Sequence, residues 1–392
     1  MKLLHLVLFL VAIGIAWYLG YRARHEPKED ELRPKLNVPR DYLIGLNFLL
    51  NEETDKAVDI FIKMLEVDSD TVETHLAVGN LFRRRGEVDR AIRIHQNLIA
   101  RPQLDKVHRE QSLFELGQDY LSAGVLDRAE KIFSDLVLAK SHVPQALKIL
   151  IDIYQQEKEW QKAIDCAFQY AKATKQPMAV AIAHYYCELA EASLNKKQYA
   201  LAVNYLNDAF LADKDSVRAS LLHGRVCIEQ GEYKQALKSL KRIKEQDPQY
   251  LSESIESLAL CYEKLNEADN LVRYLKKLLN EYPHVPVVLI LAERLRQWKG
   301  DKVAANFVAD YVRRYPTIRG LYLFLTLYIS GAEGRAKEDL AILQNLMKKI
   351  LSNKPDYQCA SCGFAGKFLH WLCPGCKQWG TVIPLHSLEE NA

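Results

Sequence analysis

Apolar and small residues recur along the middle of the chain with a period of about 34 residues. One unit of this pattern contains Leu116, Gly117, Tyr120, Ala129 and Phe133, and its spacing predicts two amphipathic helices joined by a short turn. The same register returns in units that start near residues 38, 72, 110, 144, 183, 217, 252 and 285. A single hairpin of this size cannot bury its own apolar face, so we expect neighbouring hairpins to stack.

This order of a bulky residue, Leu-Gly, Tyr and then Ala-x3-Phe is typical of tetratricopeptide repeats. Small residues at the eighth and twentieth positions let the two helices of a unit approach closely, while large residues such as Phe82 and Tyr154 fill the space between units. We therefore predict an all-α superhelical solenoid of about nine units over residues 38–351. The last unit, from about Arg319 to Leu351, is degenerate because Gly331 and Gly334 interrupt its hairpin, and we expect it to act as a cap.

The first helices of such units are expected to line a groove that binds partners. By resemblance to tetratricopeptide proteins that bind acidic peptide ends, the candidate contact residues are Asn80, Arg83, Arg84, Gln118, Arg218 and Arg225. The simpler interpretation is that each of these side chains only solvates a helix. As a class they are the predicted binding surface.

Composition agrees with a packed helical protein and excludes one broad class of function. The 392 residues include 53 Lys+Arg and 50 Asp+Glu, so the formal net charge is only +3 and a charge excess typical of nucleic-acid binding is absent. Hydrophobic residues make up 49% of the chain, and the few residues that break helices, 17 Gly and 13 Pro, favour helices over a turn-rich β protein.

The N-terminal segment predicts a membrane anchor. Leu3 to Tyr21 has no charged side chain and is long enough to span a bilayer. A secretory signal is the alternative, because Gly14 and Ala16 form a small-x-small cleavage pattern, but the apolar stretch continues beyond them and Arg22 follows it. We predict an uncleaved transmembrane anchor at 1–21 and a charged, proline-containing tether at 22–37. The excess of Lys and Arg after the span places the C-terminal part in the cytoplasm.

Four cysteines near the C-terminus predict a metal site. Cys359, Cys362, Cys373 and Cys376 form two C-x2-C hooks separated by ten residues. Four thiolates form the tetrahedral shell preferred by structural Zn²⁺ or a mononuclear Fe centre, and one such ion is the expected cofactor. A pair of redox dithiols is the alternative. The metal-binding domain is expected at 357–386, a segment too short to hold a core without help.

Aromatic residues of this C-terminal segment are expected to form an apolar face around the metal. Phe364, Phe368, Trp371 and Trp379 supply it, and we expect this face to pack against the last helices of the solenoid. No catalytic motif accompanies the metal site: the sequence around Gly366 and Lys367 lacks the residues of a P-loop, and no G-x-S-x-G or H-E-x-x-H sequence occurs. We therefore predict that the protein is not an enzyme.

The order of anchor, repeats and paired cysteine hooks resembles the lipopolysaccharide assembly protein B (LapB) family of Gram-negative bacteria over essentially the whole chain. This resemblance implies a single-pass inner-membrane protein with a cytoplasmic repeat domain and a rubredoxin-like metal domain. It further implies a non-catalytic adaptor that regulates lipopolysaccharide synthesis by promoting degradation of the deacetylase LpxC by the membrane protease FtsH. The lipopolysaccharide sensor YejM, an antagonist, and other lipopolysaccharide assembly factors are further implied partners.

Two questions stay open at the level of sequence. Lys377 stands where rubredoxins commonly have a glycine after the second hook, which leaves the choice between Zn and Fe undecided. An iron-containing electron-transfer or redox-sensing protein is the alternative function. The sequence favours the adaptor, because it contains no flavin or nicotinamide fingerprint that would supply electrons.

Overall fold

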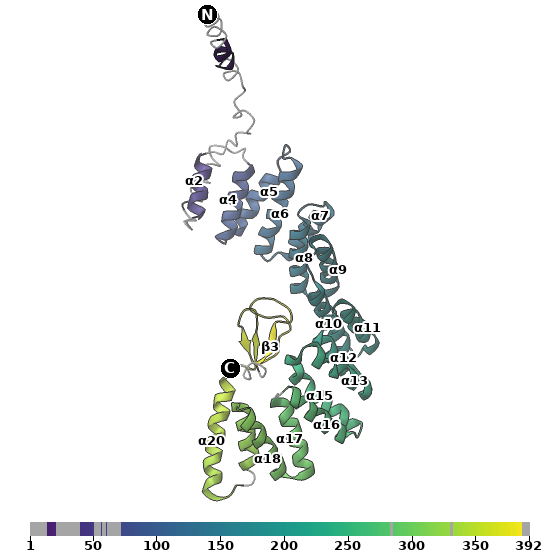
Figure 1. Cartoon of the computed structure of the whole chain (residues 1–392). Coiled ribbons are helices and arrows are strands. Elements are labelled where there is room, and N and C mark those ends of the chain that lie inside the picture. The colour runs from purple at the N-terminus through teal and green to yellow at the C-terminus, as the bar shows by residue number, and fades with distance from the viewer. Residues whose placement is uncertain are drawn as a thin grey trace, which may run out of the picture. The chain divides into compact units, whose positions relative to one another are not determined.

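The computed structural model describes residues 14–20, 40–50, 56, 60, 72–282, 285–329 and 332–385 (Figure 1). The expected anchor, Leu3 to Tyr21, lies outside the described residues except for 14–20, which are helical, and the tether at 22–37 lies outside them altogether. Within the described ranges, no helix is long and apolar enough to cross a membrane. The chain divides into two units, Met1–Ala129 and Glu130–Ala392.

The first unit consists of helical hairpins, as the repeat pattern predicts. Its described helices are α2 (Arg40–Leu50), α4 (Val72–Arg84), α5 (Val88–Ile99), α6 (Lys106–Ser122) and the start of α7 (Leu126–Leu138). Val78, Leu81 and Phe82 of α4 pack against Ala91 of α5 in one apolar cluster. Gly79 is required at the eighth position of its repeat, because a Cβ atom there would overlap the ring of His95. Close helix approach therefore explains the small residue.

The second unit continues the same hairpins. Its helices are α8 (Val143–Glu157), α9 (Trp160–Thr174), α10 (Ala179–Asn195), α11 (Tyr199–Ala212), α12 (Val217–Glu229), α13 (Tyr233–Lys241), α14 (Ile243–Gln246), η2 (Pro248–Tyr250), α15 (Leu251–Lys264), α16 (Ala268–Glu281), α17 (Val285–Lys299), α18 (Asp301–Arg314), α19 (Ile318–Ile329) and α20 (Gly334–Asn353). The first helices α12 and α17 begin at Val217 and Val285, and the repeat pattern in the sequence predicts units that start near these two residues. The all-α tetratricopeptide solenoid is thus confirmed.

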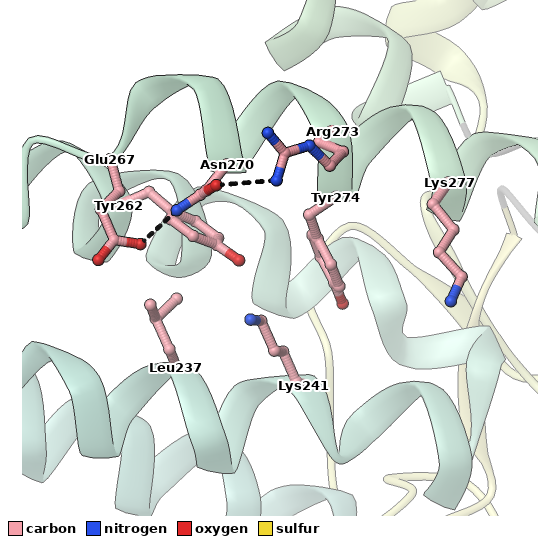
Figure 2. A pocket seen from close by; sticks show the side chains of 8 residues that line it. All are labelled: Leu237, Lys241, Tyr262, Glu267, Asn270, Arg273, Tyr274 and Lys277. Atoms are coloured by element: carbon pink, nitrogen blue, oxygen red, sulfur yellow. Dashed lines mark hydrogen bonds between the residues drawn. The ribbon is translucent and has the colours of Figure 1, made fainter.

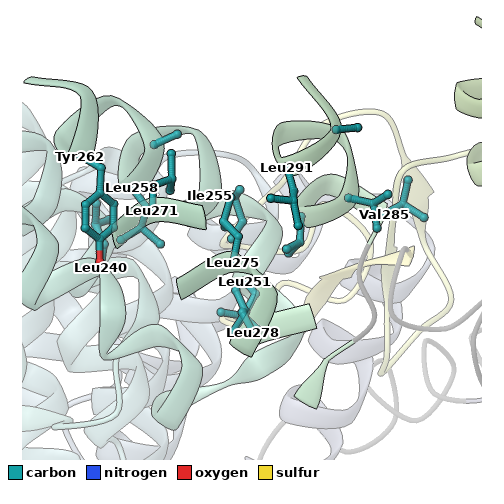
Figure 3. Packing of buried hydrophobic residues seen from close by; sticks show 14 of the residues in the cluster. Leu240, Leu251, Ile255, Leu258, Tyr262, Leu271, Leu275, Leu278, Val285 and Leu291 are labelled. Carbon is teal, nitrogen blue, oxygen red and sulfur yellow. The ribbon is translucent and has the colours of Figure 1, made fainter. Parts of the chain in front are cut away.

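Stacking buries one apolar core from α12 to α19 of this unit (Figure 3). Leu240 of α13, Leu258 of α15 and Leu291 of α17 belong to one cluster, so each hairpin completes the core of the next. The alanines at the twentieth position are fully buried wherever the structure describes them: Ala91, Ala129, Ala163, Ala202, Ala236 and Ala304. The small residues of the repeat pattern are therefore packing residues.

A small three-stranded sheet follows the last helix. Its strands β1 (Tyr357–Cys359), β2 (Ala365–Gly366) and β3 (Val382–Pro384) are arranged in the order β2-β1-β3, and both pairings are antiparallel. Gln358 lies opposite Ala365 on one side and Ile383 on the other. We call residues 357–385 the ribbon. Its short strands bring the two cysteine hooks together.

Candidate metal centre and the repeat face that holds it

The two cysteine hooks have matching local geometry. Gly363 has φ +77° and donates its N–H to the carbonyl oxygen of Cys359, and Lys377 has φ +57° and donates to the carbonyl oxygen of Cys373, each at 3.0 Å. Lys377 therefore adopts the left-handed conformation that a glycine would adopt more easily. The departure from the rubredoxin pattern noted in the sequence does not change the shape of the second hook.

The four sulfur atoms have the separations that a tetrahedral metal shell requires. Sγ of Cys359 lies 3.8 Å from that of Cys376, Sγ of Cys362 lies 3.6 Å from that of Cys373, and all four lie within 4.8 Å of one another. Four sulfurs about 2.3 Å from a central ion are about 3.8 Å apart. The shell fits one tetrathiolate ion, and this geometry suits Zn²⁺ and Fe alike.

Polar groups around the sulfurs favour the thiolate form. Thr381 Oγ1 lies 3.3 Å from Sγ of Cys359, and the backbone N–H of Cys362 also points at this sulfur. These hydrogen bonds, that of Thr381 first, lower the pKa of Cys359 to about 6. The backbone N–H of Gln378 lowers the pKa of Cys376 in the same way. Thiolates are the form that binds metal, so Cys359 and Cys376 are prepared for it. At Cys362, the backbone N–H of Phe364 lowers the pKa, but burial and hydrogen bonds with the neighbouring cysteines outweigh it and raise the pKa to about 11, so metal binding has to displace that proton.

The ribbon is held against the first helices of four successive hairpins in the second unit. Trp379 donates its indole N–H to Oε1 of Gln155 in α8 at 2.8 Å, and its ring stacks on His184 of α10 with centroids 4.9 Å apart. Trp371 stacks on Tyr250 with centroids 5.4 Å apart. Tyr250 in turn donates its hydroxyl to the carbonyl oxygen of Val382. Hydrogen bonds and ring stacking thus hold both tryptophans of the ribbon against these helices.

Arg218 of α12 lies between the two indole rings. Its guanidinium carbon is 5.9 Å from the centroid of each, and Nη2 forms ion pairs of 2.8 Å with Glu188 and Glu191. The residue is only 4% exposed, and its Nε and Nη1 atoms have no hydrogen-bond partner within the described chain, because they face the rings. Cation–π contacts in a desolvated setting of this kind stabilise an interface.

His184 is neutral in this interface. Burial, with a further contribution from the positive charge of Arg218, lowers its pKa to about 3. A Cβ atom on Gly380 would lie 3.2 Å from Nε2 of His184, so the ribbon backbone approaches the imidazole as closely as a glycine allows. No local sequence pattern marks His184 as an interface residue.

The expectation that the ribbon packs mainly on the last helices was wrong. Trp379 contacts α8, α9 and α10, and Trp371 contacts η2 and α12, which belong to the middle hairpins. Polar contacts with the last helices also exist: Arg319 of α19 forms a 2.6 Å ion pair with Asp356, just before the ribbon, and Lys367 of the ribbon donates to the carbonyl oxygen of Leu351 in α20 at 3.5 Å. Phe368, expected in the apolar face, is 75% exposed. Sequence order misled here, because the segment after α20 folds back along the solenoid.

The candidate groove residues have different environments. Arg83 forms ion pairs with Glu115 at 2.6 Å and Asp119 at 2.7 Å, and it also donates to Oε1 of Gln118. Arg84 is exposed and has no ion pair among the described residues. Asn80 is half-buried, and its Oδ1 atom has no hydrogen-bond partner among the described residues. In the second unit, Arg218 is covered as described above. Arg225 is exposed and pairs with Glu229 of its own helix.

Comparison with known families agrees with both modules. Residues 74–107, 194–261 and 257–284 match tetratricopeptide repeat families, and residues 357–384 match a rubredoxin metal binding domain. The chain is 40% identical over 384 residues to "Lipopolysaccharide assembly protein B" of Escherichia coli (strain K12), covering 98% of each chain. It is 35% identical over 394 residues to the protein of the same name from Haemophilus influenzae, again with 98% of each chain covered.

Proposed function

The chain belongs to the lipopolysaccharide assembly protein B family, and from this premise we propose that it is a membrane-anchored, non-catalytic adaptor that presents LpxC to FtsH. The similarity over 98% of both chains is the observation that carries this proposal. A solenoid of helix hairpins supports it physically, because stacked repeats offer an extended binding surface. The adaptor restrains lipopolysaccharide synthesis by committing the deacetylase to degradation.

The client-binding face in this proposal is that of the first unit. In the second unit, the ribbon covers Arg218, which removes this guanidinium from any partner. In the first unit, Arg84 is exposed on α4, and Gln118 is held in place by Arg83. An acidic segment of the client would meet Arg84 first, and Asn80 and Gln118 supply polar groups beside it.

The anchor gives the adaptor its location in the inner membrane, with the repeats in the cytoplasm. Confinement to the membrane raises the effective concentration of a second membrane protein, to about the millimolar range for a short flexible link. A weak client contact is then enough for delivery. The ribbon, held by one Zn or Fe ion, keeps the middle hairpins of the solenoid in one arrangement.

Removal of residues 1–21 tests this mechanism. The truncated chain, produced at its native level, should still bind purified LpxC but should lengthen the half-life of LpxC in cells. The matched control replaces residues 1–21 by an unrelated single-pass anchor of the same orientation, which should restore turnover. Normal LpxC turnover with the anchorless chain would show that membrane proximity is not how the protein works.

Redox sensing is the second candidate function. The four-sulfur shell supports it, because this shell can hold iron, which changes valence, as well as zinc. A visible absorption spectrum of the purified protein together with metal analysis separates the two. Iron that changes valence reversibly, with LpxC turnover following the change, would favour the sensor. A colourless protein with one Zn per chain would favour the structural role.

A further inference from the structure

A cation covers the ring of the large aromatic residue in four of the repeats. In each of them, the basic residue comes eight positions after the aromatic residue. The guanidinium or ammonium group lies 5.2–5.5 Å from the ring centroid in the pairs Lys56–Phe48, Arg90–Phe82, Arg128–Tyr120 and Lys162–Tyr154. The repeat itself therefore closes the space over this ring.

The tyrosine hydroxyls of these hairpins also have partners. Tyr154 donates its hydroxyl to Oε1 of Glu130 at 2.8 Å, and Lys162 pairs with the same carboxylate. Tyr120 accepts a hydrogen bond from Nε2 of Gln96 at 2.8 Å. In both cases the partner comes from the second helix of the preceding hairpin.

The α15–α16 hairpin departs from this arrangement at two positions. Eight residues after Tyr262 stands Asn270, which is neutral and shorter than the basic residues elsewhere. Leu237 directly follows the twentieth-position alanine, the place at which the earlier repeat has Glu130. Both the cation and the carboxylate that would close the site are thus replaced. Lys241 instead reaches across from α13, with its Nζ 5.1 Å from the ring centroid of Tyr262 and 5.2 Å from that of Tyr274.

An open cavity of about 360 Å³ results from these replacements (Figure 2). Asn270 donates to Glu267 at 2.9 Å and accepts from Arg273 at 3.3 Å, so the single acidic side chain of the lining is already hydrogen-bonded. The remaining charged side chains of the lining are cationic: Lys241, Arg273 and Lys277. With three positive charges against one negative, the cavity attracts anions.

Two polar groups of this cavity lack a hydrogen-bond or ion-pair partner within the described chain. The hydroxyl oxygen of Tyr274 is buried and makes no hydrogen bond, and Lys241 has no carboxylate within ion-pair distance. Burial raises the pKa of Tyr274 to about 12, so this hydroxyl keeps its proton and stays a donor. A buried donor without an acceptor is costly, and a ligand that supplies the acceptor would gain that free energy.

We propose that the cavity between α13, α15 and α16 binds the phosphate group of a phosphate monoester. A dianionic phosphate has three terminal oxygens, which matches one hydroxyl donor and three cations better than the two oxygens of a carboxylate do. The volume exceeds that of a bare ion and is at the lower end of the range for small-molecule sites, which is about 300–1,000 Å³. The phosphate can belong to a soluble metabolite or to a lipid headgroup.

Calorimetric titration of the full chain in detergent, at low ionic strength, tests the site with glycerol 3-phosphate as the probe. We expect binding to the wild type, and binding about tenfold or more weaker after Lys241→Met or Tyr274→Phe, each of which removes one hydrogen bond to a charged group. Lys238→Met is the matched control, because Lys238 is an exposed lysine of the same helix that does not line the cavity. It should bind as the wild type does.

A rebuilt site separates loss of binding from loss of fold. Leu237→Glu combined with Asn270→Lys recreates the Glu130, Tyr154 and Lys162 arrangement and should abolish binding while the melting temperature is kept or raised. Short-chain phosphatidic acid and glycerol 3-phosphate, compared in the same detergent, identify a lipid or a soluble source. No binding of either probe, equal binding of succinate, or equal weakening by Lys238→Met would overturn the proposal.

Discussion

Arg83 in the first unit and Arg218 in the second are two ion-paired arginines of first helices that differ in what else surrounds them. Each guanidinium is held by two carboxylates of an adjacent first helix, Glu115 and Asp119 for Arg83, and Glu188 and Glu191 for Arg218. Arg218 additionally lies between the two indole rings of the ribbon. Arg83 has no aromatic ring over it among the described residues. Its partner Asp119 also contacts Nδ1 of buried His95 in α5 at 2.5 Å, so the hydrogen-bonded network of Arg83 continues into the core of the first unit.

The comparison shows how one repeat face can serve two purposes. In the second unit, the ribbon covers the face formed by the first helices, and the aromatic side chains of the ribbon are what this face binds. In the first unit, a hydrogen-bonded polar network holds the helices, and the exposed Arg84 beside it stays available. Arg83 and Arg218 are therefore structural residues of their units.

Loss of the metal shell should have the largest effect and should act on the second unit alone. Replacing Cys359 and Cys376 by Ser removes two ligands, and structural metal binding contributes about 10 kcal/mol to modules of this kind. Hydrogen exchange should rise throughout residues 357–385 and at the α10 and α12 surface beneath them, with α4 and α6 unchanged. Cys166→Ser, which lies far from the hooks in sequence on α9, is the control. Unchanged exchange in the ribbon would contradict a structural metal.

The converse substitution should act on the first unit alone. Asp119→Ala leaves Arg83 and His95 without their shared partner, and breaking a buried ion pair costs about 3–5 kcal/mol. The free energy of local opening of α4–α6, from hydrogen exchange, measures the loss. Asp127→Ala, an exposed carboxylate on α7, should change it by less than about 0.5 kcal/mol. Equal effects of the two substitutions would show that the network is unimportant.

The aromatic contacts should matter next. Trp379→Ala removes a half-buried ring that contacts His184, Tyr185 and Trp160, and we expect the ribbon to dock more weakly by about 3 kcal/mol. Phe368→Ala, in the same ribbon but 75% exposed, is the control and should have almost no effect. Protection of residues 357–385 against limited proteolysis reports the docking. A Trp379→Ala protein as resistant as the wild type would assign the docking to other contacts.

The hairpins and the cysteine shell were predictable because their physical signals are local. The alanine at the twentieth position of seven of the eight units marks a close helix contact, and two residues between cysteines set the geometry of a hook. Docking of the ribbon was not predictable in the same way. Trp379 and Gln155 are 224 residues apart in sequence, and no periodicity links them.

The roles of individual groove residues were also beyond the sequence. Arg83 and Arg84 are adjacent and chemically identical, yet Arg83 is half-buried and ion-paired with Glu115, whereas Arg84 is exposed. Only the position of Glu115 and Asp119 on the next first helix decides between them. The anchor over residues 1–21 and the choice of metal stay predictions.

Mild acid should weaken ribbon docking through His184. Its pKa is about 3 when buried and about 6.5 when exposed, so a proton binds more tightly to the undocked state. The stabilisation is therefore complete above about pH 6.5 and is lost as the pH falls toward 3. At pH 5.5 the loss should be on the order of 1 kcal/mol. His184→Gln should flatten this part of the pH profile, and an unchanged profile would rule out this imidazole as the titrating group.

The smallest expected effect separates the two units as binding surfaces. Arg84→Glu and Arg225→Glu are matched charge reversals on exposed first-helix positions of the first and second units, and neither should change stability by more than about 0.5 kcal/mol. If an acidic client segment uses the first unit, Arg84→Glu should weaken its binding by about 1 kcal/mol, or about fivefold, mainly through slower association. Arg225 already pairs with Glu229, so its reversal should change client binding little.

Binding of purified LpxC to both variants at two salt concentrations measures these effects, because the contribution of Arg84 should shrink as salt screens its charge. A larger loss from Arg225→Glu would move the client site to the second unit, where the client would have to share the repeat face with the ribbon.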